Sequence, residues 1–253
     1  MTVTAGSLKV KIFADGADRD GMLQLHRDPL IRGFTTNPTL MRKAGVSNYE
    51  AFAQEILSHI DDRPISFEVF SDDLSEMERQ ALKIASWGDN VYVKIPITNT
   101  NGEPSAPVVT RLAARGVKVN VTALMTVAQV RSMARSLAGG PPACVSVFAG
   151  RVADTGVDPV PVMKAALEAI AACPNIELIW ASPREVFNIV QADAIGCHII
   201  TVTHDLLKKL PMLGKDLNEL SLDTVRMFRR DAEAAGFSLE VNGRRPNTVT
   251  EAA

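Results

Sequence analysis

The sequence predicts an α/β fold in which eight parallel strands and their helices form a (β/α)8 barrel, the TIM barrel. Eight short runs rich in β-branched and apolar residues recur along the 253 residues, and most are separated by enough chain for a helix. Eight strands close such a barrel, and about 250 residues is its typical size. The rival is an open doubly wound sheet, which usually carries a glycine-rich phosphate loop after the first strand. Residues 15–18 read Asp-Gly-Ala-Asp at that place, so we favour the barrel.

Each of the eight predicted strands is short enough to be an ordinary strand, and the runs follow one another at barrel-like intervals. In chain order they are residues 10–14, 33–36, 65–70, 91–95, 118–122, 144–148, 177–180 and 197–202. Strands that alternate with helices in this way form a parallel sheet.

Start signals mark several of the helices between the strands. Residues 47–50 and 126–129 have the capping-box pattern, in which a hydroxyl residue precedes a Glu or Gln by three positions. At 158–159 and 182–183 a residue able to cap a helix precedes a proline, which is favoured at the first helical position. The sequence therefore predicts a helix start at each of these four places.

The C-terminal part of the chain changes in character. Residues 221–235 have apolar side chains at helical spacing, which predicts an amphipathic helix. Residues 238–253 are polar and aperiodic, so we expect a flexible tail there. The predicted organisation is thus one barrel domain over residues 1–237, followed by that tail.

Composition and charge exclude several classes of function. Lys plus Arg total 27 and Asp plus Glu 29, and the net charge of −2 gives no reason to expect a nucleic acid or an anionic membrane as partner. We see neither a signal peptide at residues 1–20 nor an apolar stretch that could span a membrane. Three cysteines without CxxC spacing fit a cytoplasmic protein, and four histidines without a ligand pair predict no metal.

Polar residues interrupt strands that a closed barrel should bury on both faces. They lie toward the strand ends that precede the helices, where a barrel carries its chemistry. Because side chains alternate between faces along a strand, those two positions apart share a face, and we expect them to converge on one cavity. The residues are Asp15, Thr35, Asn37, Glu68, Lys94, Asn120, Thr122, Ser146 and Ser182.

Lys94 is the sharpest chemical signal in the sequence. Burial of an ammonium group is costly and favours the neutral amine, which is the form that attacks a carbonyl. Asp15 and Glu68 suit proton transfer in a Schiff-base cycle. The alternative is structural: Lys94 forms an ion pair with one of these carboxylates, or extends to the barrel mouth. Both roles can coexist.

A phosphate site is predicted beyond the sixth and seventh strands. A helix start at Ser182 would supply free backbone N–H groups at the barrel's usual phosphate position. Arg184 beside it and Arg151 beyond the sixth strand would add charge-assisted hydrogen bonds. Either arginine by itself is more often a solvated surface charge.

Four motifs together resemble the transaldolase family: GFTTNPT at 33–39, VKIP at 93–96, NVT at 120–122 and ASPR at 181–184. Their order and approximate spacing hold from Phe13 to about Leu210. The resemblance implies a barrel of the class I aldolase type that needs no metal or organic cofactor. It also implies sugar-phosphate substrates and a homo-oligomer, often assembled through a C-terminal helix.

The resemblance also implies a role for each matching residue. Lys94 matches the Schiff-base lysine, Asp15 the acid/base carboxylate, and Glu68 with Thr122 the pair that activates the catalytic water. The substrate-binding positions, which hold sugar hydroxyls, line the pocket or bind the phosphate, are Thr35, Asn37, Asn120, Ser146, Phe148, Arg151, Ser182 and Arg184.

Two positions distinguish branches of the family, and one departs from it. Glu68 and Phe148 resemble transaldolases, whereas the fructose-6-phosphate aldolase branch has glutamine and tyrosine there. Pro183 replaces a usual aromatic residue, which affects pocket shape. The resemblance implies transfer of a dihydroxyacetone unit from a ketose phosphate, of the sedoheptulose 7-phosphate or fructose 6-phosphate type, to an aldose phosphate. The alternatives are an aldolase that releases dihydroxyacetone and a non-catalytic sugar-phosphate-binding barrel.

Overall fold

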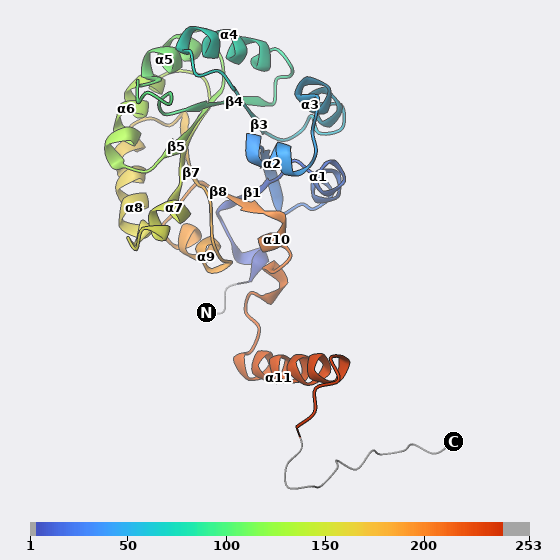
Figure 1. The fold of residues 1–253 in the computed structure, drawn as a ribbon. Helices are drawn as coiled ribbons and strands as arrows, with labels where there is room; N and C mark the ends of the chain where they lie inside the picture. Colours follow the sequence, from blue (N-terminus) through green and yellow to red (C-terminus); the bar gives the residue numbers. More distant parts are fainter. Residues whose placement is uncertain (1–3, 240–253) are drawn as a thin grey trace. The chain divides into compact units, whose positions relative to one another are not determined.

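Eight parallel strands close into a barrel in the computed structural model, which describes residues 4–239 (Figure 1). Each strand pairs with its neighbours in chain order, and β8 pairs with β1. All eight predicted strands are confirmed. They are β1 Lys11–Asp15, β2 Ile31–Thr35, β3 Ile65–Glu68, β4 Val91–Pro96, β5 Val119–Leu124, β6 Ala143–Val147, β7 Ile176–Trp180 and β8 Ile199–Thr203.

Helices follow the strands and surround the barrel (Figure 1). They are α1 Arg19–His26, α2 Pro38–Lys43, α3 Tyr49–Leu57, α4 Leu74–Ala85, α5 Ala106–Ala114, α6 Val127–Leu137, α7 Ala149–Asp154, α8 Pro159–Ile170, α9 Phe187–Ala194 and α10 His204–Leu207, with short 3₁₀ turns at Ala5–Ser7 and Leu210–Met212. In the described part of the chain no helix is both long and apolar enough to cross a membrane.

Two of the four predicted helix starts are confirmed, one shifts and one is wrong. Thr126 caps α6 in a full capping box, and Asp158 caps α8 before its proline. The cap of α3 is Asn48, one residue into the predicted 47–50 box, where its side chain accepts from the third helical N–H. Ser182 caps no helix, because its φ of 57° is left-handed whereas an N-cap residue is extended. The helix after β7 begins only at Phe187.

The chain divides into two compact units, residues 1–213 with the barrel and residues 214–253. The second unit contains α11 Leu217–Ala234, which Asp216 caps and which begins at Leu217, four residues before the predicted start at 221. From residue 240 on, the expected tail of residues 238–253 lies outside the described residues.

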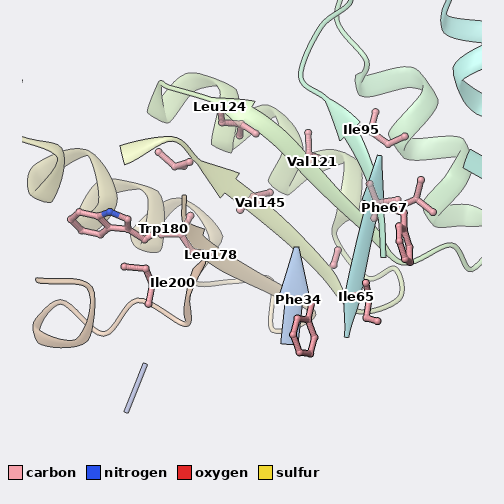
Figure 2. Packing of buried hydrophobic residues seen from close by; sticks show 14 of the residues in the cluster. Phe34, Ile65, Phe67, Ile95, Val121, Leu124, Val145, Leu178, Trp180 and Ile200 are labelled. Carbon is pink, nitrogen blue, oxygen red and sulfur yellow. The ribbon is translucent and has the colours of Figure 1, made fainter. Parts of the chain in front are cut away.

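The apolar core has two layers, and together they explain where polar residues are left exposed to a cavity. The larger layer lies between the strands and the helices and includes Phe34, Phe67 and Trp180, which are fully buried (Figure 2). The smaller layer lies inside the barrel and is made of Phe13, Cys144, Ile179, Ala181 and Ile199. Because strand side chains alternate, the next inward positions on β1, β6 and β8 are the polar residues Asp15, Ser146 and Thr201, which line a cavity at the carboxyl ends of the strands.

Candidate active site

A cavity of about 350 Å³ opens at the carboxyl ends of the strands. This is the end at which (β/α)8 barrels carry their chemistry. Ten of the twelve residues singled out from the sequence line it: Asp15, Thr35, Asn37, Glu68, Lys94, Thr122, Ser146, Phe148, Arg151 and Ser182. Asn120 and Arg184 do not.

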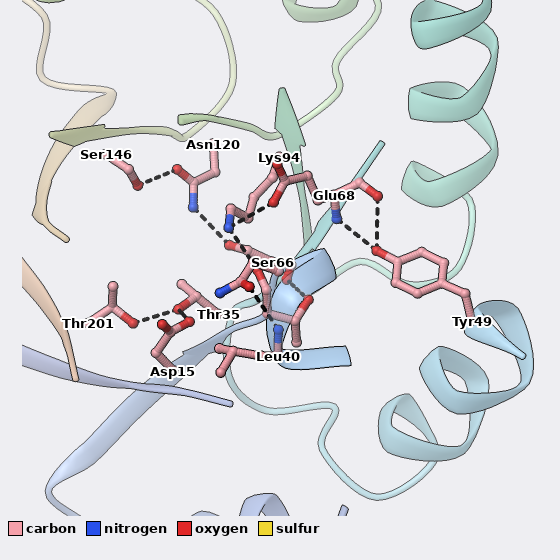
Figure 3. A network of polar contacts seen from close by, with 12 residues as sticks. Asp15, Thr35, Leu40, Tyr49, Ser66, Glu68, Lys94, Asn120, Ser146 and Thr201 are labelled. Atoms are coloured by element: carbon pink, nitrogen blue, oxygen red, sulfur yellow. Dashed lines mark hydrogen bonds and ion pairs between the residues drawn. The ribbon is translucent and has the colours of Figure 1, made fainter. Parts of the chain in front are cut away.

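Lys94 lies in the middle of β4 and is only 5% exposed. Its Nζ donates to the Thr36 carbonyl at 2.7 Å and lies 3.1 Å from Oε2 of Glu68 (Figure 3). The ion pair expected under the structural alternative is therefore present, and the same carboxylate is placed to accept the proton that the amine must lose before it attacks a carbonyl.

Strand register brings Lys94 and Glu68 together. In the parallel pair of β3 and β4, Glu68 stands directly opposite Lys94, and both side chains point inward. The β4–β5 register places Asn120 opposite Lys94 on the other side. Neighbouring inward positions on parallel strands are close enough for their side chains to interact, so the barrel itself builds the pair.

Asp15 ends β1 beside the cavity and is tied to its neighbours by hydroxyl groups. The Thr35 hydroxyl donates to Oδ1 of Asp15 at 2.7 Å and shares a 2.5 Å hydrogen bond with the Thr201 hydroxyl (Figure 3). Burial raises the pKa of Asp15, against the opposing effects of the Lys94 charge and of the Thr35 hydrogen bond. A carboxyl group whose pKa is raised in this way holds a proton more readily than an exposed aspartate, which suits it to take up and return a proton.

Asn120 lies just below the cavity. It is fully buried, and its Nδ2 donates to the Ser66 hydroxyl at 3.0 Å while its Oδ1 accepts from Ser146 at 2.7 Å. The amide thus joins β3, β5 and β6 under the cavity floor. Asn37 does line the cavity, but its Oδ1 caps α2 by accepting from the Leu40 N–H at 3.0 Å, which leaves its Nδ2 as the group available to a ligand.

Thr122 has an unsatisfied polar group. Its hydroxyl is buried and makes no hydrogen bond within residues 4–239. Next to it, Ala123 has a φ of 64°, where the β5–β6 register shifts between Val121 and Leu124. A buried hydroxyl without a partner is costly, and such backbone strain is concentrated at functional sites. The Thr122 hydroxyl is placed to bind a group that enters the cavity.

The predicted phosphate-site residues separate into two groups. Arg151 lines the cavity from α7, with its guanidinium 5.4 Å from the centre of the Phe148 ring, and Ser182 lines it from the loop after β7. Arg184 instead pairs with Asp154, donating from Nε to Oδ1 at 3.0 Å, and this pair lowers the pKa of Asp154. Gly150 allows α7 to approach the loop after β7, because a Cβ there would lie 1.6 Å from the Ser182 carbonyl oxygen.

The sequence did not predict three residues of the site. Thr201 could have been found, because it is a polar residue at an inward position of β8, two residues after the buried Ile199. Ser66 could have been found in the same way on β3. Tyr49 gives no such signal, because it belongs to a helix outside the barrel and reaches β3 only in the folded chain. Within residues 4–239 no group of three His, Cys, Asp or Glu side chains could hold a metal ion.

Comparisons with known proteins give consistent results. The chain matches the family described as Transaldolase/Fructose-6-phosphate aldolase over residues 12–239. It is 32% identical over 235 residues to a "Probable transaldolase" of Thermoanaerobacter sp. (strain X514), which covers 91% of this chain and 100% of that protein. It is 34% identical over 202 residues to a "Probable transaldolase 2" of Listeria monocytogenes, with 79% and 88% covered. A solved structure of a mandelate oxidase variant is similar in fold alone, with a TM-score of 0.55, 15% identity, and 92% of this chain and 77% of that chain covered.

Proposed function

The chain belongs to the transaldolase/fructose-6-phosphate aldolase family, and from this premise we propose that it is a transaldolase. It transfers a dihydroxyacetone unit from a ketose phosphate to an aldose phosphate through a Schiff base on Lys94. The observation that carries the proposal is the buried Lys94 amine, 3.1 Å from the Glu68 carboxylate at the floor of a polar cavity. The enzyme needs no cofactor in this scheme and acts in the cytoplasm as a homo-oligomer.

Imine formation begins with proton transfer within the buried pair. Glu68 accepts a proton from the Lys94 ammonium, and the neutral amine attacks C2 of the ketose to give a carbinolamine. Glu68 then returns the proton to the carbinolamine hydroxyl, which leaves as water. The Thr122 hydroxyl, which has no hydrogen-bond partner in the described part of the chain, holds that water.

Cleavage follows from the position of Asp15. Asp15 accepts the proton of the C4 hydroxyl while the C3–C4 bond breaks, and the bonding electrons move into the iminium to give an enamine on Lys94. From fructose 6-phosphate the departing aldehyde is glyceraldehyde 3-phosphate. The enamine carbon then attacks an incoming aldose phosphate, and Asp15 returns its proton to the new hydroxyl group.

The phosphate binds on the side of the cavity formed by α7 and the loop after β7. Arg151 is the cation there, and it forms no ion pair within the described residues. Arg184 joins Arg151 at the phosphate by breaking its ion pair with Asp154. This is possible because the side chains of Arg184 and Asp154 are each about half exposed. Exchange of such a pair costs little, because ion pairs exposed to solvent contribute little to stability.

Reductive trapping tests the proposal. The protein is incubated with fructose 6-phosphate and sodium borohydride, and the peptide that contains Lys94 is analysed by mass spectrometry. The expected result is a reduced adduct on Lys94, chiefly with the mass of the dihydroxyacetone unit that cleavage leaves on the lysine, absent in a Lys94→Arg variant, which keeps the charge but lacks the nucleophile. Absence of the adduct from the native protein would refute the Schiff-base mechanism.

A second measurement distinguishes the transaldolase hypothesis from the aldolase hypothesis. Glu68 and Phe148 support the transferase, since the aldolase branch carries glutamine and tyrosine there. Free dihydroxyacetone is measured during turnover of fructose 6-phosphate with and without erythrose 4-phosphate. A transaldolase forms sedoheptulose 7-phosphate and releases little dihydroxyacetone, whereas release at the same rate with and without the acceptor would establish the aldolase.

A further inference from the structure

The hydrogen-bond ladder between β2 and β3 stops one step before Glu68, the residue that pairs with Lys94. The N–H groups of Phe34 and Thr36 donate to the carbonyls of residues 64 and 66 at 2.8 and 3.1 Å. Continuation of this parallel pattern would pair the Glu68 N–H with the Thr36 carbonyl, and the Glu68 carbonyl with the N–H of residue 38. Residue 38 is a proline and has no N–H to donate.

The Tyr49 hydroxyl occupies both of these vacant positions. It accepts from the Glu68 N–H at 2.8 Å and donates to the Glu68 carbonyl at 3.0 Å (Figure 3). Because the Glu68 N–H is satisfied in this way, the Thr36 carbonyl is free to accept from Lys94 Nζ at 2.7 Å. The Tyr49 hydroxyl therefore fixes the backbone of Glu68 and leaves the Thr36 carbonyl to Lys94. These two residues supply the carboxylate and the carbonyl that hold the Lys94 amine.

Tyr49 is itself held rigidly from outside the barrel. It is the first residue of α3, and its ring makes edge contacts with Phe67, Phe70 and Trp87 at centroid distances of 6.1, 4.5 and 5.7 Å. Burial raises the pKa of Tyr49, so it remains a neutral phenol that can donate and accept at once. Because the packed ring of Tyr49 has little conformational freedom, its hydroxyl can hold the end of β3 in one position.

We propose that Tyr49 is a positioning residue for the Schiff-base lysine: its hydroxyl replaces the missing ladder partner of Glu68 and keeps the Thr36 carbonyl available to Lys94. The inference rests on the proposed function for its effect on turnover. Its structural content, the coupling of a phenol outside the barrel to the Lys94 amine inside it, can be tested without any sugar.

The decisive variant is Tyr49→Phe, which keeps the aromatic contacts and removes one oxygen. The Glu68 N–H then returns to the Thr36 carbonyl, and Glu68 loses its fixed position. Lys94 then shares the Thr36 carbonyl with the Glu68 N–H and is held less firmly, so its amine is freer to meet a small carbonyl compound but is no longer aligned for the sugar. The matched control is Tyr92→Phe, since Tyr92 is the chain's only other tyrosine and packs against the inner apolar cluster at the opposite end of the barrel.

Two readouts should move in opposite directions in Tyr49→Phe. The kcat for sugar transfer falls about tenfold while KM stays within about twofold, because one lost hydrogen bond disturbs alignment but not the cavity lining. Reductive methylation by formaldehyde and cyanoborohydride, a sugar-free carbonyl probe, becomes about threefold faster at Lys94 relative to the exposed Lys164. Tyr92→Phe should leave both values at the native level. Native kcat and methylation in Tyr49→Phe, or equal changes in both variants, would overturn the inference.

A spectroscopic measurement covers the case in which Tyr49→Phe fails to fold. In a Tyr92→Phe background, 3-fluorotyrosine labels Tyr49 alone, and its ¹⁹F resonance should shift when Lys94 is replaced in a Lys94→Met variant. An unchanged resonance would refute the coupling. If the native protein forms no adduct with fructose 6-phosphate, the proposed function fails, but the methylation and ¹⁹F results still decide whether Tyr49 is coupled to Lys94.

Discussion

Replacement of Asp15 by asparagine should separate formation of the imine from cleavage of the sugar. The amide keeps the size of the carboxyl group and an oxygen that can accept from the Thr35 hydroxyl, now 2.7 Å away. It cannot accept the proton of the C4 hydroxyl. Lys94 and Glu68 keep their 3.1 Å contact, so the steps that precede cleavage remain available.

The magnitude follows from the role assigned to this group. A positioned acid/base residue contributes about a hundredfold to ten-thousandfold in rate, equivalent to about 3–5 kcal/mol of activation free energy. The fold should not suffer. Because burial raises the pKa of Asp15, the native state holds this proton more tightly than the unfolded chain does. Its contribution to the free energy of unfolding is therefore present at low pH and lost as the pH rises through the raised pKa, and Asp15→Asn removes that loss.

The assay compares turnover with reductive trapping in the same samples. Asp15→Asn should lose transfer of the dihydroxyacetone unit yet accumulate the reduced adduct of the intact ketose on Lys94, whereas Lys94→Met should lose both. The melting temperature of Asp15→Asn near neutral pH should equal or exceed that of the native protein. Loss of the adduct together with activity in Asp15→Asn, with the fold intact, would show that Asp15 acts before cleavage and would refute the assignment.

Four further substitutions and one control variant test the site and its scaffold. Glu68→Gln should raise dihydroxyacetone release relative to transfer by about tenfold, equivalent to about 1.4 kcal/mol, and an unchanged product ratio would remove Glu68 as the discriminating residue. Arg151→Ala should raise KM for fructose 6-phosphate about tenfold to a hundredfold and leave KM for unphosphorylated fructose unchanged, with a smaller rise for Arg184→Ala because that side chain must first leave an ion pair. Gly150→Ala should lower the free energy of unfolding in urea by about 3 kcal/mol, because its Cβ would lie 1.6 Å from a backbone oxygen, whereas Gly6→Ala, with open space around it, should not.

Local sequence patterns were sufficient for the strands and for the inward polar positions. Lys94, Glu68 and Asp15 are identified as cavity residues because they are polar residues that interrupt or follow apolar strands near the strand ends, and period-two alternation identifies which positions share a face. Motif resemblance then supplied chemical roles that periodicity cannot provide. The helix start predicted at Ser182 is wrong because the close approach of Gly150, from another part of the chain, accompanies a left-handed backbone at Ser182.

The remaining features of the site depend on contacts between elements that are distant in the sequence. Arg184 pairs with Asp154, thirty positions away, and Asn120 is taken up by hydroxyls from two other strands. These hydrogen-bond partners lie too far apart in the chain for a local sequence pattern to predict them. The Tyr49 hydroxyl reaches Glu68 only after α3 packs on the barrel.

The sequence by itself determined eight strands, their closure into a barrel and the kinds of side chain that face its mouth, because hydrophobic periodicity and strand alternation are local properties. The tertiary structure alone decided which polar groups share a hydrogen bond and which enter the cavity. Those outcomes depend on register between strands and on helices packed from outside, and both arise from the folding of the whole chain.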